Sequence, residues 1–393
     1  MPLRVLFLSD THLGLDLPGR PRVDRPRRGD DLFASFERAL EPAIRGEAGV
    51  VIHGGDLFYR SRVPAWLAER VFARLADLAD SGVDLFWVPG NHERGAIPRE
   101  LLLTHPRVKV FDRPRTFVVR RDGVTLALSG FPYAPCVRDI APALLAETDA
   151  DSVRADVRLL CLHQAIEGAT VGPSDYVFRS GVDVLRGADV PPAFAAVLSG
   201  HIHRAQVLTK DLAGRPLAAP VLFAGSTDRV SFAERFEPKG SFLLELSSDG
   251  SPGGRATWTF REHRVRPMAL VEIDPVPPGL SERIDAALAR LEPRSLVRLR
   301  LLAEPPAESL PLLRPEALRA RAPAGFDVSV AWPRAEGAST RAAPAPVPAA
   351  RSGRSRRAAP AGDAEAQLSF EPIRPSQPQG PAPRQATNRK RSA

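Results

Sequence analysis

Short apolar runs alternate with longer segments of helical periodicity along residues 1–266. Between residues 64 and 78, apolar side chains recur at the 3.6-residue spacing of a helix, behind a proline that suits a helix start. Residues 31–44 carry a similar apolar stripe. The short runs predict strands at residues 4–9, 50–53, 84–88, 116–119, 125–130, 158–162, 195–199, 221–224 and 241–246. This alternation predicts a layered α/β domain.

The pattern changes after residue 266. An amphipathic helix is predicted at residues 280–291. Strands are predicted around it at residues 269–273, 296–301 and 326–331. Beyond them the chain is mostly Ala, Pro, Arg, Ser and Gln, a composition that cannot bury enough apolar surface to fold. The sequence therefore predicts a large domain of residues 1–266, a small α+β appendage of residues 267–332 and a disordered tail of residues 333–393.

The net charge of +8 is concentrated in this tail. From residue 334 onward there are 11 Lys or Arg residues against 4 Asp or Glu residues, so this stretch carries +7 and residues 1–333 carry +1. The basic groups at residues 351–357 and 389–391 can attract nucleic acid by counterion release. A solubilising linker is the alternative. The rest of the chain gives no indication of nucleic-acid binding from its net charge.

No stretch approaches the roughly 18 consecutive apolar residues of a membrane span. The apolar residues 3–8 run directly into Ser9 and Asp10, which predicts a strand and not a signal peptide. Cys136 and Cys161 are the two cysteines, and neither lies in a Cys-x-x-Cys pair, so no disulfide or zinc-finger framework is indicated. We therefore expect a cytoplasmic protein with two core thiols and no membrane association.

Five short polar segments lie at or just beyond the ends of predicted strands, and they hold five of the eight histidines. In layered α/β folds, loops at the carboxyl ends of strands converge on one crevice. Asp, Asn and neutral His are ligands suited to Mn²⁺, Fe²⁺ or Zn²⁺. The segments are Asp10-Thr11-His12, Gly55-Asp56, Gly90-Asn91-His92-Glu93, Leu162-His163 and Gly200-His201-Ile202-His203.

Each segment alone has an ordinary explanation. An Asp-x-His sequence is typical of a turn or a helix cap, and His163 by itself is equally consistent with a hydrogen-bonded core histidine. Their joint occurrence favours one shared metal site. Two divalent ions bring four positive charges, of which Asp10 and Asp56 remove two, so the site stays electropositive, as a phosphodiester requires. Two such ions can polarise phosphoryl oxygens, and a further histidine can protonate the leaving oxygen.

These segments resemble the signature of the calcineurin-like metallophosphoesterase family, over most of residues 1–265. The resemblance implies a four-layer α/β fold, a β-sandwich flanked by helices, with two divalent metal ions. It also implies that His92 is the acid that assists the leaving group. The implied metal ligands are Asp10, His12 and His203 for one ion, Asn91, His163 and His201 for the other, and Asp56 as the bridge between them.

A narrower resemblance rests on Ser-Asp-Thr-His-Leu-Gly at residues 9–14, Gly-Gly-Asp-Leu-Phe at residues 54–58 and the segment of residues 225–240. These are similar to the SbcD-type DNA double-strand-break repair nucleases. The resemblance implies a DNA exonuclease or endonuclease that uses Mn²⁺, a capping domain at residues 267–332, an SbcC-like ABC-type ATPase partner and a homodimer. Tyr59 stands where these relatives have His or Asp, and we expect Tyr59 and Arg229 to contact the substrate.

Two other functions remain open at this stage. The same metal site could hydrolyse a nucleotide, a cyclic nucleotide or a phosphoprotein, or the chain could be a non-catalytic scaffold subunit. The complete set of expected ligands argues against the scaffold. In the tail, Gln-Leu-Ser-Phe at residues 367–370 resembles a peptide that docks onto sliding clamps, although one expected leucine is missing.

Overall fold

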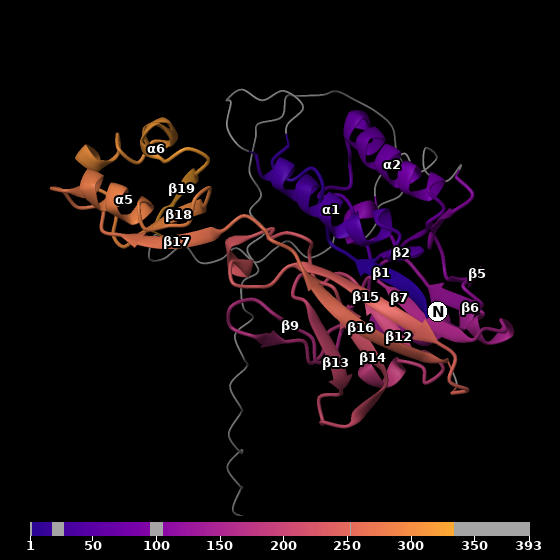
Figure 1. Ribbon diagram of the computed structural model, residues 1–393. Helices are drawn as coiled ribbons and strands as arrows, with labels where there is room; N and C mark the ends of the chain where they lie inside the picture. Colours follow the sequence, from indigo (N-terminus) through magenta and orange to yellow (C-terminus); the bar gives the residue numbers. More distant parts are fainter. Residues whose placement is uncertain (1, 18–26, 95–104, 252, 334–393) are drawn as a thin grey trace, which may run out of the picture. The chain divides into compact units, whose positions relative to one another are not determined.

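The computed structural model describes residues 2–17, 27–94, 105–251 and 253–333 (Figure 1). The expectations of a disordered basic tail and of a clamp-docking peptide lie outside these residues. The domain boundaries at residues 266 and 332 stay predictions. Within the described ranges, no helix combines the length and the apolar character needed to cross a membrane.

Six strands form the first sheet, in the order β16-β15-β1-β2-β3-β4. Strands β1 to β4 pair in parallel, whereas β15 and β16 join antiparallel at the other edge of β1. The strands are β1 (Leu3–Leu8), β2 (Val50–His53), β3 (Asp84–Trp87), β4 (Val108–Val110), β15 (Gly240–Ser247) and β16 (Arg255–Glu262).

A second sheet has six strands in the order β13-β14-β12-β7-β6-β5. Its central strands β6, β7, β12 and β14 pair in parallel, and β5 and β13 close the two edges antiparallel. The strands are β5 (Arg115–Arg121), β6 (Val124–Gly130), β7 (Val157–Leu162), β12 (Ala196–Ser199), β13 (Gln206–Lys210) and β14 (Pro216–Phe223). Short two-residue strands follow β7: β8 (Ala165–Ile166), β9 (Thr170–Val171), β10 (Tyr176–Val177) and β11 (Val184–Leu185).

The two sheets pack face to face through one apolar core, in which Phe7 and Ile52 of the first sheet meet Leu128 and Leu198 of the second. Helices α1 (Arg28–Ile44) and α2 (Ala65–Asp80) cover the other face of the first sheet (Figure 1). Helix α4 (Val137–Glu147) packs against the outer side of the second sheet. These four layers confirm the predicted fold, a β-sandwich flanked by helices.

A smaller three-stranded parallel sheet, in the order β17-β18-β19, has its own apolar core that includes Ile284, Leu299 and Leu318. Its strands and helices alternate along the chain. They are β17 (Met268–Ile273), α5 (Leu280–Leu288), β18 (Leu296–Leu301), α6 (Pro315–Arg321) and β19 (Asp327–Ala331). Except for α6, each of these elements was predicted from the sequence.

The parallel strands bring the polar segments to one end of the sandwich. Strands β1, β2 and β3 run in the same direction in the first sheet, as do β7 and β12 in the second. Each of these five strands is followed by one of the five polar segments. A single parallel bridge between Ser9 and Ser226 then connects the end of β1 to the loop that follows β14. The carboxyl ends of both sheets therefore supply one site.

Candidate metal centre

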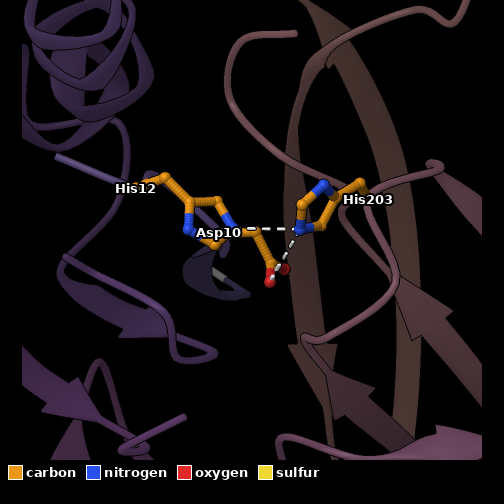
Figure 2. A group of neighbouring side chains, drawn as sticks. All are labelled: Asp10, His12 and His203. Carbon is orange, nitrogen blue, oxygen red and sulfur yellow. Dashed lines mark hydrogen bonds and ion pairs between the residues drawn. The ribbon is translucent and has the colours of Figure 1, made fainter. Parts of the chain in front are cut away.

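One group of possible metal ligands consists of Asp10, His12 and His203, whose side chains point toward one another (Figure 2). The Nε2 atoms of His12 and His203 lie 2.9 Å apart, and Nε2 of His203 lies 3.9 Å from Oδ1 of Asp10. Asp10 and His12 are buried. The two segments that carry this group, one after β1 and one after β12, were both expected to contribute to it.

A second group forms around Asp56 and Asn91. Oδ1 of Asn91 lies 3.0 Å from Nδ1 of His201 and 3.2 Å from Nε2 of His163. Nε2 of His163 is in turn 3.5 Å from Oδ2 of Asp56. Asp56 also forms possible metal-binding groups with His12 and His92, and with Asp10 and His163. Its carboxylate therefore lies between the group of Asp10, His12 and His203 and the group of Asn91, His163 and His201.

The chemistry of these side chains fits divalent metal ions. Oδ2 of Asp10 is buried and has no hydrogen-bond partner among the described residues, although an ionised carboxylate requires compensation there. Burial, together with the neighbouring His163, lowers the pKa of His201 to about 3. Burial and His203 likewise hold the pKa of His12 well below its usual value. Both imidazoles are neutral at pH 7, which is the form that binds a metal.

The backbone at the centre turns sharply to bring these side chains together. Asp10, His12, Asp56 and His201 have φ angles of 52°, 45°, 51° and 78°, in the left-handed region that residues with a Cβ rarely adopt. Each such position costs on the order of 1–3 kcal/mol. Main-chain hydrogen bonds hold two of them, from Asp10 N to Gly55 O at 2.9 Å and from His12 N to Asp56 O at 3.0 Å.

Glycine is required at two positions in these turns. A Cβ atom on Gly90 would lie 2.2 Å from Oδ1 of Asp56, and one on Gly55 would lie 2.2 Å from Nδ1 of His163. Gly55 also has a φ of 105°, which favours glycine independently of the contact. The two glycines therefore leave the space that the side chains of Asp56 and His163 occupy.

Glu93, the residue after His92, joins two of the loops. Its buried carboxyl group accepts hydrogen bonds from the backbone N–H groups of Gly90 at 2.7 Å, Asp56 at 2.9 Å and Phe58 at 3.0 Å. Burial and the charge of Asp56 raise the pKa of Glu93 to about 8. The loop after β2 and the loop after β3 are thus fixed to one side chain, and with them Asp56 and Asn91.

His92 lies at the border of the centre, in the short helix η1 (Asn91–Arg94). Its Nε2 is 3.9 Å from Oδ2 of Asp56, and its side chain is 20% exposed. Its Nδ1 lies 2.5 Å from the carbonyl oxygen of Tyr59, which accepts only, so Nδ1 carries a proton and Nε2 faces the carboxylate. The predicted acid is therefore near the ligands and still open to solvent.

The two predicted substrate contacts differ in their position. The ring of Tyr59 lies beside the centre, with its centroid 6.1 Å from those of His12 and His92. The guanidinium of Arg229 instead donates hydrogen bonds to the carbonyl oxygens of Arg266 at 3.3 Å and Glu237 at 3.4 Å. Tyr59 therefore lies beside the candidate ligands, whereas the guanidinium of Arg229 is bound to main-chain carbonyl groups. The substrate-binding role of both residues stays a prediction.

A buried charge network lies directly behind His203. Nδ1 of His203 is 3.1 Å from Oε1 of Glu234, and Nζ of Lys239 donates to Oε2 of Glu234 at 2.7 Å. Lys239 also reaches Ser226 at 2.9 Å, the carbonyl of His203 at 2.8 Å and Glu237 at 3.2 Å. A carboxylate on the second nitrogen of an imidazole fixes its tautomer, so that Nε2 of His203 is left to face Asp10.

The charged groups in this network shift each other's pKa values in the direction opposite to the effect of burial. Burial raises the pKa of Glu234, but Lys239 and His203 outweigh it and hold that pKa well below its usual range. Burial lowers the pKa of His203, but the carboxylate of Glu234 outweighs this, and the pKa is raised overall. The network therefore keeps Glu234 ionised at neutral pH.

Comparison with known proteins agrees with this geometry. Residues 3–205 match the family model of the calcineurin-like phosphoesterases. The chain belongs to this family. It is 30% identical over 275 residues to the DNA double-strand break repair protein Mre11 of Haloferax volcanii, covering 69% of this chain and 54% of that protein. It is 25% identical over 257 residues to the Mre11 protein of Saccharolobus solfataricus, covering 63% of this chain and 61% of that protein.

The chain therefore spans little more than half the length of these two curated relatives. The predicted family and the similarity to Mre11- and SbcD-type repair nucleases are confirmed. Calcineurin-like phosphoesterases use divalent metal ions, and this phosphoesterase gathers possible ligands for them in three overlapping groups of described residues.

Sequence reasoning assigned no role to Glu93, Glu234 or Lys239. Glu93 stands within one of the polar segments, so its position was a signal that it lies near the ligands. Glu234 and Lys239 stand in the segment of residues 225–240, which carried the resemblance to the repair nucleases but gave no role for either side chain. The segment is a loop between two predicted strands, where charged side chains are normally exposed. Their burial in this phosphoesterase arises from the packing of that loop against His203, which local sequence does not encode.

We predict that Lys239→Met destabilises the protein by about 3–5 kcal/mol, because it leaves the buried carboxylates of Glu234 and Glu237 without their shared cation. Urea denaturation followed by circular dichroism measures this change. Lys210→Met, at an exposed lysine, is the matched control and should change stability by less than about 0.5 kcal/mol. Equal, small effects of both substitutions would contradict the structural role of Lys239.

Proposed function

We propose that this phosphoesterase is a two-metal nuclease that acts on DNA ends in double-strand-break repair, with Mn²⁺ as its metal. The observation that carries the proposal is the shared position of Asp56, which forms possible metal-binding groups with both His12 and Asp10. Two ions that share one carboxylate suit phosphodiester hydrolysis. The similarity to Mre11 proteins supports DNA as the substrate class.

In this proposal the residues divide into two sets. Asp56 bridges, Asn91, His163 and His201 would hold one ion, and Asp10, His12 and His203 the other. Bound ions would supply positive charge that polarises the phosphoryl oxygens. Residues outside the ligand set would hold the ligands in place. Glu93 connects the loops of Asp56 and Asn91, and Glu234 orients His203.

His92 would act as the general acid. Its Nδ1–H donates to the Tyr59 carbonyl, which orients the ring, and Nε2 would give a proton to the leaving oxygen. The side chain is 20% exposed, so a substrate can reach it, and its main chain is held by a hydrogen bond from His92 N to Oδ1 of Asp56 at 3.0 Å. Positioned proton transfer of this kind contributes about 10²–10⁴-fold.

The experiment that tests the function compares cleavage of linear duplex, hairpin and single-stranded DNA with hydrolysis of a chromogenic phosphodiester, in the presence of Mn²⁺. His92→Ala should lower kcat on DNA by about 10²–10⁴-fold and keep Mn²⁺ affinity in calorimetry, because His92 is not a ligand in this proposal. Asp56→Ala should lose both activity and Mn²⁺ binding.

His105→Ala is the control for these variants, because His105 pairs with Asp80 away from the ligand groups and should keep both properties. Normal DNA cleavage by His92→Ala would contradict the role of His92. Hydrolysis of nucleotides or phosphoproteins without any cleavage of DNA would show that the protein is a different kind of phosphoesterase and not a nuclease.

Tyr59 is proposed to contact the DNA beside the scissile phosphate. A phenol can hydrogen-bond to a phosphate or stack on a base, but it carries protons poorly at neutral pH compared with His. We therefore predict that Tyr59→His changes the ratio of end-degrading to internal cleavage more than it changes hydrolysis of a small phosphodiester. Gel analysis of end-labelled and circular DNA gives this ratio. Equal changes on both substrates would indicate that Tyr59 only packs beside the loop.

An SbcC-like ABC-type ATPase is the proposed partner, and the active form is proposed to be a homodimer bound to it. With a net charge of +1, residues 1–333 exert little long-range attraction on duplex DNA, and we propose that the ATPase adds DNA affinity beyond that of the basic groups at residues 351–357 and 389–391. Affinity purification from the native cell with mass spectrometry should recover such an ATPase. Recovery of the chain alone, with duplex cleavage that persists at physiological salt, would contradict this.

A further inference from the structure

Phe236 is more exposed than any other large hydrophobic side chain among the described residues, at 81%. It lies between the short helix η4 (Phe232–Glu234) and strand β15. An aromatic ring in water forgoes the hydrophobic stabilisation that burial would give. A single exposed apolar residue is common in proteins, so its surroundings decide whether the ring has a role.

The segment that carries Phe236 is fixed on both sides. Glu234 and Glu237 are buried, and both contact the buried Nζ of Lys239. Glu237 also accepts a hydrogen bond from Nε of Arg204 at 3.1 Å, and its backbone N–H donates to the carbonyl of Glu234 at 2.9 Å. Because its neighbours are anchored in the interior, the ring of Phe236 is held outward.

Arg235, the residue before Phe236, packs on the ring of Phe236. The guanidinium of Arg235 lies over the ring of Phe236, with its central carbon 4.4 Å from the ring centroid. A guanidinium on an aromatic ring adds positive charge to an apolar face. This pairing matches the chemistry of a nucleobase followed by its phosphate, because bases stack on aromatic rings and phosphates attract arginine.

The same segment lies next to His203 of the candidate centre. Glu234, two residues before Phe236, contacts His203, and two residues span at most about 7 Å. The side chain of His203 is 26% exposed and that of His92 is 20% exposed, whereas Asp10 and His163 are buried. Solvent therefore reaches the centre beside His203, and Phe236 projects from the segment that supports this residue.

We propose that Arg235 and Phe236 form a stacking site for an unpaired base at the end of the DNA substrate. The proposal rests on the nuclease function proposed above. Bases inside a duplex are already stacked on their neighbours, so only a frayed or single-stranded terminal base can reach the ring. The site would hold the separated strand at the rim of the centre and favour ends over internal positions.

The test uses the full chain with Mn²⁺ and two substrates, a duplex with a single-stranded overhang and a small chromogenic phosphodiester. Phe236→Ala should lower the ratio of kcat/KM on the overhang duplex to kcat/KM on the small substrate by roughly tenfold, within the range of one base–aromatic stack. Phe236→Trp should keep this ratio, because it retains a ring. Val182→Ala, at another hydrophobic side chain that is 57% exposed, is the matched control and should also keep it.

A fluorescent base analogue at the overhang provides a second readout, because its emission falls when it stacks on a ring. The wild type and Phe236→Trp should quench it, and Phe236→Ala should not. An unchanged ratio in Phe236→Ala would overturn the site, as would a change of oligomeric state in that variant, which would make the ring an interface between chains. If the wild type hydrolyses the small substrate but does not bind or cleave DNA, the proposed nuclease function itself fails, and the stacking site fails with it.

Discussion

Asp10 and Asp56 bring two carboxylates into the interior, and the repulsion between them governs the arrangement around them. Ligand atoms of Asp10, Asp56 and His163 all lie within 4.8 Å of one another. Like charges at this separation in a medium of low dielectric constant are unstable without compensation. The imidazoles of His12 and His201 are neutral at pH 7. Burial lowers the pKa of His163, but the carboxylate of Asp56 outweighs it and raises that pKa to about 9, so His163 supplies one compensating charge. Bound cations would replace this proton as the charge that compensates the two carboxylates.

The two sheets contribute to this arrangement separately. The first sheet supplies Asp10, His12, Asp56 and Asn91, and the second supplies the three other histidines. Two contacts connect the sheets at this end. One is the β-bridge between Ser9 and Ser226, and the other is the hydrogen bond from the backbone N–H of His201 to Oδ1 of Asp10, at 3.1 Å. The spacing of the sheets, set by the core between them, thus determines the distances between ligands.

Much of this could be predicted from the sequence, because buried parallel strands read as continuous apolar runs. The strands that carry the ligands were all predicted, and so was the convergence of their ends. Helix α4, which contains Pro142, was missed. Strand β16 was missed although Ala256, Trp258 and Phe260 alternate along it, a signal that could have identified it. The burial of Glu234 and Lys239 depends on contacts between distant segments, and no local pattern reports it.

Gly55 and Gly90 show how a site can depend on residues that contribute no ligand atom. Their missing side chains leave the volume that His163 and Asp56 fill, so an added methyl group at either position would displace a candidate metal ligand by direct contact. A related chain that kept every histidine and aspartate but replaced one of these glycines would retain the recognisable motif and lose the geometry. Motif matching alone would then classify an inactive protein as an enzyme. The absence of a side chain at these two positions is therefore as important for recognising an active site as the candidate ligands.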